Sequence, residues 1–390
     1  MFSGDGGPSL QTPAAMKPYL SIALVAAFAI GAPPARAQPP PPPASQTLAV
    51  PGWTAALQSS LEAVDARHRG DIGVYVRHLD RDESFSHRAD EPWYLASGIK
   101  VPVAIAVLRA VAAGALSLDT RVTLLASDYV DGAGGTNAFA PGTPLRVSWL
   151  LEQMIVHSDN TASDVLIRSV GIDQVNAVAM ELTGVRDLRI TTLADVRRLA
   201  YGQLHPAAAK LQSVDLLAIR RSGSGPARVR KFSQLLSLSP DQLRLGNLDE
   251  AFEAYYATHV NSATLVDFGQ MLAALSDGRA LPPEQTIYLL DLMARVQTGH
   301  RRLRAGLPPG TRFEHKTGTQ HRRSCDLGIA TVPAAASGAA PARVVIAACA
   351  RGMGAAAGER ALREVAAAVT ASGVFMDALP RPTVSPSAPR

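Results

Sequence analysis

Hydrophobic and polar positions follow a strand period near both ends of the chain and a helical period between them. Residues 54–67 carry apolar side chains at helical spacing, residues 71–78 alternate, and a short returning strand reaches Phe85. Helical spacing then dominates from Ser97 to about Arg304. Strand character returns in three later runs, and an apolar helical segment closes the pattern: 311–318, 325–332, 343–350 and then 361–374.

This order predicts an α+β fold. Both chain ends would build one antiparallel sheet flanked by helices, and the middle of the chain would form a separate, all-helical lobe. We expect the sheet lobe to comprise residues 51–96 and 305–378, and the helical lobe residues 97–304. A cleft between two such lobes is a natural place for a binding or catalytic site.

The ends of the chain read as segments outside this fold. A basic residue, a short apolar run and an A-x-A pattern fill residues 17–37, so we expect a secretory signal peptide with an N-terminal extension over residues 1–37. The apolar run is too short to span a bilayer. Residues 38–50 would be a proline-rich linker, residues 51–378 the folded domain and residues 379–390 a disordered tail. The leader predicts a periplasmic or extracellular protein.

Composition narrows the classes of function. The chain has 390 residues, a hydrophobic fraction of 47% and a formal net charge of +5 at pH 7. Its arginines are scattered and 5% of its residues are aromatic, so the sequence offers no basic stripe or stacking platform for nucleic acid. Lysine is scarce, and beyond the leader it occurs at Lys100, Lys210, Lys231 and Lys316. A lysine inside a motif is therefore hard to dismiss as an ordinary surface residue.

Two cysteines, Cys325 and Cys349, lie in neighbouring strand-like runs. If these runs form a hairpin that turns near Ser337, the cysteines fall almost opposite each other and a disulfide is possible. A shift of one residue would send them to opposite faces of the sheet. The sequence leaves both arrangements open.

The strongest candidate for chemistry opens the helical region. Ser97 and Lys100 are three residues apart, and on a helix such positions share one face with about 5–6 Å between Cβ atoms. We expect Ser97 in the first turn, near the positive end of the helix dipole. Lys100 lies in apolar sequence, and burial favours its neutral form. A nucleophile beside a base suits covalent catalysis, whereas a helix start with an incidental lysine is the alternative.

Two further motifs occur in order along the chain. An S-D-N motif begins at Ser158, after a helical run, and a K-T-G motif begins at Lys316, at the end of a strand. Alone, each fits a helix cap or a strand end. Together with Ser97 and Lys100, they make the sequence resemble the class A β-lactamases and related penicillin-binding proteins. The resemblance covers about residues 53–374 and includes the β-lactamase/transpeptidase-like order of sheet, helical lobe and sheet.

The resemblance implies a role for each reactive group. Ser97 would attack a carbonyl carbon, and Lys100 would take its proton. Ser158 would relay a proton to the departing nitrogen. Lys316 would supply a fixed positive charge that keeps Lys100 neutral and favours a substrate carboxylate.

The same resemblance implies substrate contacts. Asn160 would hold the amide side chain of the substrate, and Thr317 and Thr319 would bind its carboxylate. The backbone N–H groups of Ser97 and Thr319 would form the oxyanion hole. Gly318 would let the substrate backbone approach the edge strand closely.

Tyr129 lies where the family often places an aromatic residue at the cleft mouth, and a packing role is the alternative. The interval from Ser158 to Lys316 is longer than in the family. The extra residues fall at about 191–260, which we interpret as an enlarged insertion with helices at 193–204 and 229–236.

The deacylating glutamate of class A enzymes has no evident counterpart. The E-x-x-L-N context that carries it is not found, and the family spacing from Ser158 leads to residues 193–195 instead. Asp249 and Glu250 are possible substitutes, and the alternative is that both are surface residues of an amphipathic helix.

The resemblance therefore implies an exported serine hydrolase that opens β-lactam amides through an acyl-Ser97 intermediate. One alternative is a penicillin-binding-protein-like peptidase, transpeptidase or esterase with slow deacylation. Another is a protein that captures a β-lactam or cell-wall ligand without turnover. We expect a monomer that acts on a small β-lactam or peptidoglycan-derived acyl substrate. We expect no cofactor, no metal, no nucleic acid partner and no stable membrane span after removal of the leader.

Overall fold

The computed structural model describes residues 52–81, 83–334 and 340–376. The expected signal peptide, the proline-rich linker, the tail at 379–390 and the hairpin turn near Ser337 lie outside these described residues.

An antiparallel sheet of five strands takes its members from both ends of the chain, which confirms the α+β prediction. The run predicted at residues 71–78 forms one strand without change. The three later runs form three more strands, each one or two residues longer than predicted, and the short returning strand that reaches Phe85 forms the fifth. The K-T-G motif lies on the strand at one edge of the sheet. In spatial order the strands are β2 (Glu83–His87), β1 (Asp71–His78), β9 (Ala342–Arg351), β8 (Arg323–Val332) and β7 (Arg312–Gln320).

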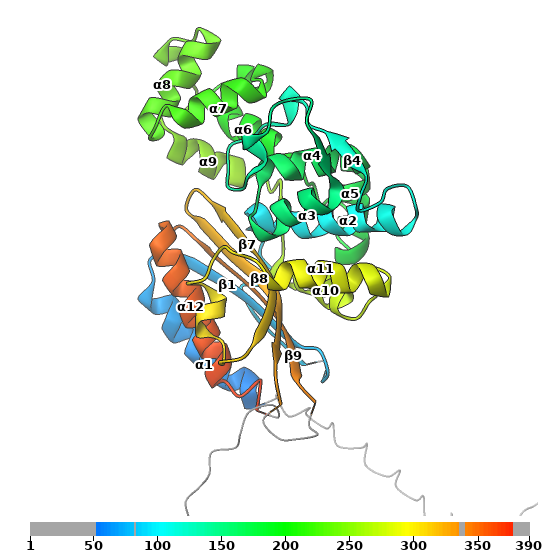
Figure 1. Cartoon of the computed structure of the whole chain (residues 1–390). Coiled ribbons are helices and arrows are strands. Elements are labelled where there is room, and N and C mark those ends of the chain that lie inside the picture. Colours follow the sequence, from blue (N-terminus) through cyan, green and yellow to red (C-terminus); the bar gives the residue numbers. More distant parts are fainter. Residues whose placement is uncertain (1–51, 82, 335–339, 377–390) are drawn as a thin grey trace, which may run out of the picture. The chain divides into compact units, whose positions relative to one another are not determined.

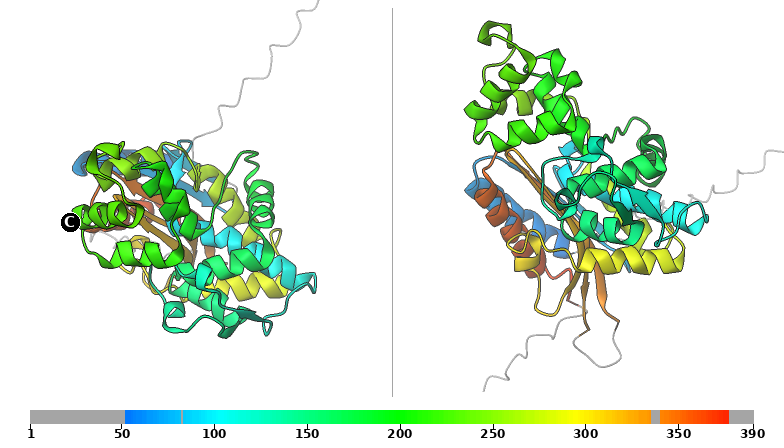
Figure 2. Two further views of the ribbon diagram at one scale, coloured as in Figure 1. Left: turned by 90° about the horizontal axis from the view of Figure 1, so that it is seen from above. Right: turned by 45° about the horizontal axis from the view of Figure 1, so that its top comes forward.

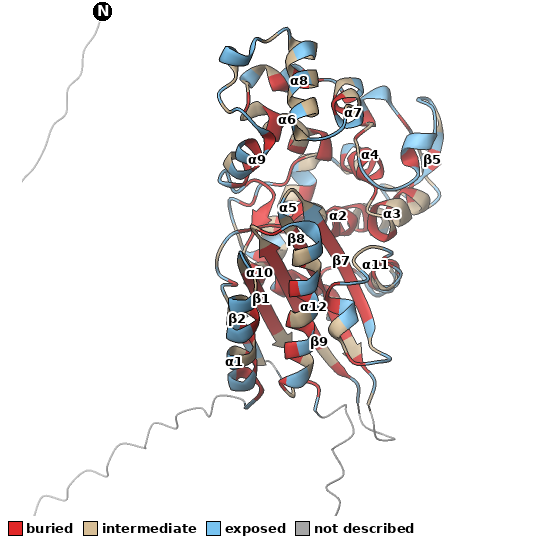
Figure 3. Ribbon diagram, turned by 90° about the vertical axis from the view of Figure 1, so that its left-hand side faces the viewer, coloured by how far each residue is buried: buried red, intermediate tan, exposed pale blue. Residues whose placement is uncertain are grey.

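Helices α1 (Gly52–Arg67) and α12 (Ala355–Ala371) cover one face of this sheet (Figure 1). Alternate side chains of a strand point to opposite faces, so Val74 of β1 and Ile346 of β9 are buried on this side, in one cluster with Leu57 of α1. Exposed residues run along the outer sides of both helices (Figure 3). α12 begins earlier than the sequence predicted, because its first turns are rich in alanine and glycine and carry little apolar periodicity.

The helical lobe packs against the other face, where α10 lies over β1 and β9. Its central helix α2 is buried over residues 100–108, which explains the long apolar run after Ser97. The helices of this lobe are α2 (Lys100–Ala112), α3 (Val147–Val156), α4 (Asn160–Val170), α5 (Ile172–Thr183), α10 (Leu265–Ser276) and α11 (Pro283–Ala294).

Two short strand pairs and several 3₁₀ turns interrupt the helical region, and the sequence did not predict them because two or three residues are too few to show a period. The pairs are β3 (Trp93–Tyr94) with β6 (Ser262–Ala263), and β4 (Arg121–Thr123) with β5 (Pro144–Arg146). The 3₁₀ turns are η1 (Ala96–Ile99), η2 (Ala126–Asp128), η3 (Thr136–Ala138), η4 (Pro206–Lys210), η5 (Pro240–Gln242) and η6 (Leu303–Gly306).

The expected insertion contributes four helices that lie side by side as one group (Figure 2). Phe232 is fully buried among them and stacks on Tyr201 with 5.6 Å between ring centroids, so the insertion has packing of its own. Two contacts attach its last helix to the β7–β8 turn: Arg323 pairs with Glu253, and Tyr256 donates to the carbonyl of His321. The four helices are α6 (Leu193–Gly202), α7 (Ser213–Arg221), α8 (Gly225–Leu236) and α9 (Leu248–Tyr256).

The strand register settles the question of the cysteines. β8 and β9 pair with Cys325 directly opposite Cys349, and a disulfide joins the two residues. The alternative register, in which they would face opposite sides, is therefore excluded. Both sulfur-bearing side chains are buried on the face that carries the helical lobe.

Gly318 marks a close contact between β7 and the segment that leads to Ser97. A Cβ atom at Gly318 would lie 2.2 Å from the carbonyl oxygen of Leu95 and 3.2 Å from the Cβ of Ala96. The requirement for glycine here thus has a reason that the sequence did not reveal: the strand lies directly on the chain's own backbone.

Replacing both cysteines, Cys325→Ala with Cys349→Ala, should lower the free energy of unfolding by about 3 kcal/mol, because the bond closes a loop with a sequence separation of 24. Urea titration of the wild type and the double variant measures the difference. Titration of the denatured wild type with a thiol reagent should find no free thiol. Two reactive thiols, or equal unfolding free energies, would contradict the bond.

Gly318→Ala should lower the free energy of unfolding by about 1–3 kcal/mol, because β7 must move away from Leu95 to admit the methyl group. Gly202→Ala is the matched control, since a Cβ at this helical position meets no atom within 4 Å. The control should keep or slightly raise stability. Thermal and urea unfolding check both variants, and equal effects at the two positions would argue against the close contact.

Candidate active site

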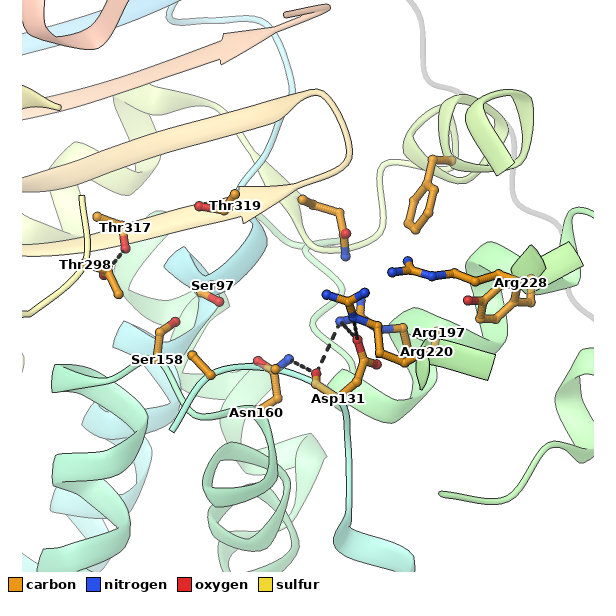
Figure 4. A pocket seen from close by; sticks show the side chains of 15 residues that line it. Ser97, Asp131, Ser158, Asn160, Arg197, Arg220, Arg228, Thr298, Thr317 and Thr319 are labelled. Carbon is orange, nitrogen blue, oxygen red and sulfur yellow. Dashed lines mark hydrogen bonds and ion pairs between the residues drawn. The ribbon is translucent and has the colours of Figure 1, made fainter. Parts of the chain in front are cut away.

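A cavity of about 530 Å³ brings together most of the residues that the motifs singled out (Figure 4). Ser97, Ser158, Asn160, Thr317 and Thr319 all line it. The other lining residues are Asp131, Gly132, Ala133, Arg197, Tyr201, Arg220, Arg228, Phe252, Thr298 and Gln320.

Ser97 lies in the 3₁₀ turn η1, and Lys100 is the first residue of α2. The sequence predicted that an α-helix begins at Ser97, whereas in the structure Ser97 lies in a 3₁₀ turn and the α-helix begins at Lys100. Side chains three residues apart eclipse each other in such a turn, so the pair still shares one side. Ala96, which precedes the serine, has a left-handed φ of 49°, a conformation that costs energy and is typical of functional sites.

Ser158 is the point at which the two buried lysines meet. Lys316 Nζ donates to Ser158 Oγ at 2.9 Å, and Lys100 Nζ donates to the same oxygen at 3.3 Å and to the Ser158 carbonyl at 2.6 Å. Ser158 itself has a left-handed φ of 61°. The carboxylate of Asp159 holds this turn, because it caps α4 through the N–H of Ala162 and accepts from the N–H of Thr136.

Asn160 links this cluster to the loop opposite. Its Oδ1 accepts from Lys100 Nζ at 2.8 Å, and its Nδ2 donates to the carbonyl of Asp131 at 2.6 Å. Both ends of the amide are therefore oriented, and one N–H of Nδ2 remains to donate into the cavity. In this structure Lys100 is bonded to Ser158 and Asn160, while Ser97 lines the same cavity without a hydrogen bond to Lys100 among the described residues.

Burial sets the charge state of both lysines. It lowers the pKa of Lys100 to about 7, against the opposing effect of the carboxylates of Asp159 and Asp164. Burial also lowers the pKa of Lys316 well below its usual value, and repulsion from Lys100 and Arg302 adds to the shift. The sequence predicted a fixed charge on Lys316. The structure instead indicates two amines that disfavour being charged at the same time.

A buried pair lies behind Lys316 on the sheet. His315 Nδ1 is 2.6 Å from a carboxylate oxygen of Asp326, which lies on β8 opposite Thr317. Asp326 favours the protonated form of Lys316, so it opposes the effect of burial on that pKa. Sequence reasoning missed this pair because neither residue belongs to a motif that signals it.

Arg302 is a second residue that sequence reasoning missed. Its guanidinium is buried and donates to the carbonyls of Gly318 and Cys325 at 2.8 Å each, and to the hydroxyl of Thr319 at 2.6 Å. It thereby fixes the end of β7 and orients Thr319. The neighbouring Thr317 forms a short hydroxyl contact with Thr298. A single arginine in an arginine-rich loop carries no local signal.

Lys100, Lys316 and Gly318 do not line the cavity themselves, but each bonds or adjoins a residue that does. Three other residues predicted for the site have no such connection. Tyr129 donates to the carbonyl of Phe139 and packs beside the cluster rather than lining it. Asp249 is exposed and pairs with His321 at 3.2 Å, and Glu250 is an exposed residue in the first turn of α9. The geometry therefore gives no support to Asp249 or Glu250 as a deacylating base, because neither lies beside Ser97.

The segment at residues 193–195, to which the family spacing points, also brings no carboxylate to the cavity. Asp164 accepts from the backbone N–H groups of Leu193 and Ala194, which anchors the start of α6, and burial raises the pKa of Asp164 to about 7. Asp195 pairs with Arg198 instead. Among the residues that line the cavity, Asp131 is the one carboxylate.

Neither a metal site nor a membrane span emerges from the part of the chain that is described. Within it, no group of three or more His, Cys, Asp and Glu side chains is placed to hold a metal ion. None of its helices is both long enough and apolar enough to cross a bilayer.

Comparison with known proteins places this geometry in a family. The model of the "Beta-lactamase enzyme family" matches residues 56–372. A β-lactamase of Mycobacterium tuberculosis is 25% identical over 293 residues, which cover 75% of this chain and 77% of the relative. The β-lactamase ROB-1 of Haemophilus influenzae is 28% identical over 143 residues, 36% of this chain and 46% of the relative.

Solved structures agree on the fold. A β-lactamase from Sphaerobacter thermophilus superimposes with a TM-score of 0.58 and 26% identity, over 83% of this chain and 97% of that structure. The structure of PBP-A, at 22% identity, shares the fold with a TM-score of 0.59 over 82% of this chain and 96% of its own. Because the family match extends over most of the chain, this protein belongs to the β-lactamase enzyme family and is a serine β-lactamase-like hydrolase.

Proposed function

We propose that the protein opens β-lactam amides through an acyl-Ser97 intermediate, in the manner of class A enzymes. The observation that carries this proposal is the meeting of Lys100 and Lys316 on Ser158 Oγ, in the cavity that Ser97 lines. The β-lactamases of Mycobacterium tuberculosis and Sphaerobacter thermophilus, which the chain resembles, support the same substrate class.

During acylation a proton passes from Ser97 to the leaving nitrogen by way of Lys100 and Ser158. Neutral Lys100 takes the hydroxyl proton of Ser97 as Ser97 Oγ forms a bond to the lactam carbonyl carbon. The carbon–nitrogen bond breaks, Ser158 gives its proton to the departing nitrogen, and Lys100 returns a proton to Ser158. The hydrogen bond between Lys100 Nζ and Ser158 Oγ provides the route for this last transfer. Backbone N–H groups of Ser97 and Thr319 would stabilise the oxyanion.

Binding uses opposite ends of the cavity. A substrate carboxylate would lie against Lys316 and the hydroxyl of Thr319, which accepts from Arg302 and so keeps its own proton available to donate. The remaining N–H of Asn160 would hold the carbonyl of the acyl side chain. β7 is the edge of the sheet, so its outer side is open to a ligand backbone.

Release of the acyl group distinguishes two candidate functions. After acylation Lys100 is neutral again and can activate a water molecule, which would complete hydrolysis. The second candidate is a penicillin-binding-protein-like enzyme with slow deacylation. This candidate is favoured because the described residues that line the cavity include one carboxylate, Asp131, and Asp131 already pairs with Arg197. No carboxylate among these lining residues is therefore left unpaired to activate a water molecule for deacylation.

We also propose that the protein works outside the cytoplasm. The leader-like sequence of residues 17–37 supports this, and so does the disulfide between Cys325 and Cys349, since such bonds persist in oxidising compartments.

Incubation with benzylpenicillin should add one penicilloyl group to the protein, and Ser97→Ala should carry none. Intact-protein mass spectrometry over time measures both the formation and the loss of this adduct. Rapid loss with released penicilloate supports a lactamase, whereas an adduct that persists supports the slow-deacylating candidate. An adduct that forms equally on Ser97→Ala, or none with any β-lactam, would refute acyl-Ser97 chemistry.

The rate of acylation should rise with pH through about 7 and then level off. Only neutral Lys100 can accept the proton of Ser97, and burial sets its pKa at about 7, so the protonated, inactive form dominates below that value. Stopped-flow acylation with a chromogenic β-lactam at a series of pH values measures this rising limb of the pH–rate profile.

Asp164→Asn tests the assignment of this limb. Its carboxylate favours protonated Lys100, so its removal should move the limb to lower pH. Glu181→Gln, at an exposed carboxylate paired with Arg109, should leave the limb in place. A rate that does not change with pH around 7 would contradict Lys100 as the base.

A further inference from the structure

We propose that the cavity has a second anion site, formed by the insertion, which binds a carboxylate at the far end of the substrate's acyl chain. We call it the arginine wall and define it as Arg197 of α6, Arg220 of α7 and Arg228 of α8. The proposal rests on the proposed function and adds to it a substrate class: β-lactams whose acyl side chain ends in a negative charge.

The arginine wall lies at the acyl-chain end of the cavity. Figure 4 shows Thr298 and Thr317 at one end, Arg220 and Arg228 at the other, and Ser97 between them. A chain of contacts sets this order, because Asn160 donates to the carbonyl of Asp131 and Asp131 pairs with Arg197. A substrate that places its amide on Asn160 therefore extends its acyl chain towards the arginines.

The positive charge of the wall exceeds the negative charge that faces it. Three guanidinium groups and one carboxylate, Asp131, line this end of the cavity. Arg197 donates to both carboxylate oxygens of Asp131, at 2.7 and 3.1 Å, and Arg220 Nε lies 3.6 Å from one of them. The carboxylate of Asp131 is thus paired with Arg197 and Arg220, and about two positive charges at this end of the cavity are not balanced by a carboxylate.

The remaining donors are available to a ligand. Arg228 uses Nε to bond the carbonyl of Gly223, and Arg220 uses Nε towards Asp131. The terminal nitrogens of both residues have no hydrogen-bond partner within the described residues. Asp249 lines an adjoining cavity together with Arg228, but it pairs with His321 rather than with this arginine. A carboxylate between Arg220 and Arg228 would receive charge-assisted hydrogen bonds from both.

The wall also suits the methylene groups of an acyl chain. Tyr201 and Phe252 line the same end of the cavity and offer apolar surface beside the cations. Tyr201 stacks on the fully buried Phe232, so the helices that carry the arginines share one packed core. A ligand with an apolar spacer and a terminal carboxylate matches this combination better than a neutral or cationic chain.

The test compares two substrates that differ only in the charge at the end of the acyl chain. One is 6-aminopenicillanic acid acylated with adipic acid, and the other is the monomethyl ester of the same side chain. The second-order acylation constant is measured for both, and their ratio is the readout. Wild type should favour the free acid by about three- to tenfold at low salt, because exposed ion pairs are individually weak, and less at high salt.

Arg220→Gln with Arg228→Gln should bring this ratio close to one. Arg221→Gln with Arg230→Gln is the matched control, because these arginines are exposed on the same two helices and do not line the cavity. The control should keep the wild-type ratio. Both substrates meet the same enzyme sample, so partial unfolding of a variant cancels in the ratio. A ratio near one in the wild type, or one unchanged by the double variant, would overturn the arginine wall.

Ser97→Ala separates this proposal from the proposed function. The variant cannot be acylated, so calorimetric titration measures binding of the acid and of the ester alone. If wild type acylates with neither compound while Ser97→Ala binds the acid more tightly, the proposed function fails and the arginine wall stands. If wild type acylates with both at equal constants, the function stands and the wall fails. Equal binding of acid and ester to Ser97→Ala also counts against the wall.

Discussion

Two buried amines that share one hydroxyl are the contact on which the rest of the molecule depends. Lys100 reaches Ser158 Oγ from the start of a buried helix, and Lys316 reaches it from the edge strand of the sheet. Burial lowers the pKa of both lysines and outweighs the nearby carboxylates of Asp159, Asp164 and Asp326. Repulsion from Lys100 lowers the pKa of Lys316 further. The protein thus obtains a base near neutral pH from packing, without a histidine to supply it.

Holding that contact requires a firmly positioned edge strand, because an edge strand has a neighbour on one side alone. Three features supply the support. Arg302 bonds the carbonyls of β7 and β8, the disulfide fastens β8 to β9, and Gly318 lets β7 lie against the backbone before Ser97. The strained backbone at Ala96 and Ser158 lies within the same contact region, where surrounding structure can sustain it.

The sequence predicted well those parts of the fold that repeat or that form a local motif. The alternation at residues 71–78 is that of β1, and the spacing of Ser97, Lys100, Ser158 and Lys316 along the chain leads to residues that share one cavity or bond one another across it. Their roles in catalysis remain predictions.

Other contacts depend on folding between distant residues and leave no such pattern. The contacts of Arg302 form only when β7 and β8 pair, so the sequence could not predict them. The arginine wall forms only when three helices come together near Asp131. The positions of Tyr129 and Asp249 in the sequence predicted that both would lie in the site. In the structure Tyr129 bonds the carbonyl of Phe139 and Asp249 pairs with His321 instead. The last helix of the insertion is clamped to the β7–β8 turn by Glu253. This helix also packs against α6 and α8, which carry two of the arginines, so a single helix joins the turn after the K-T-G strand to the cationic end of the cavity.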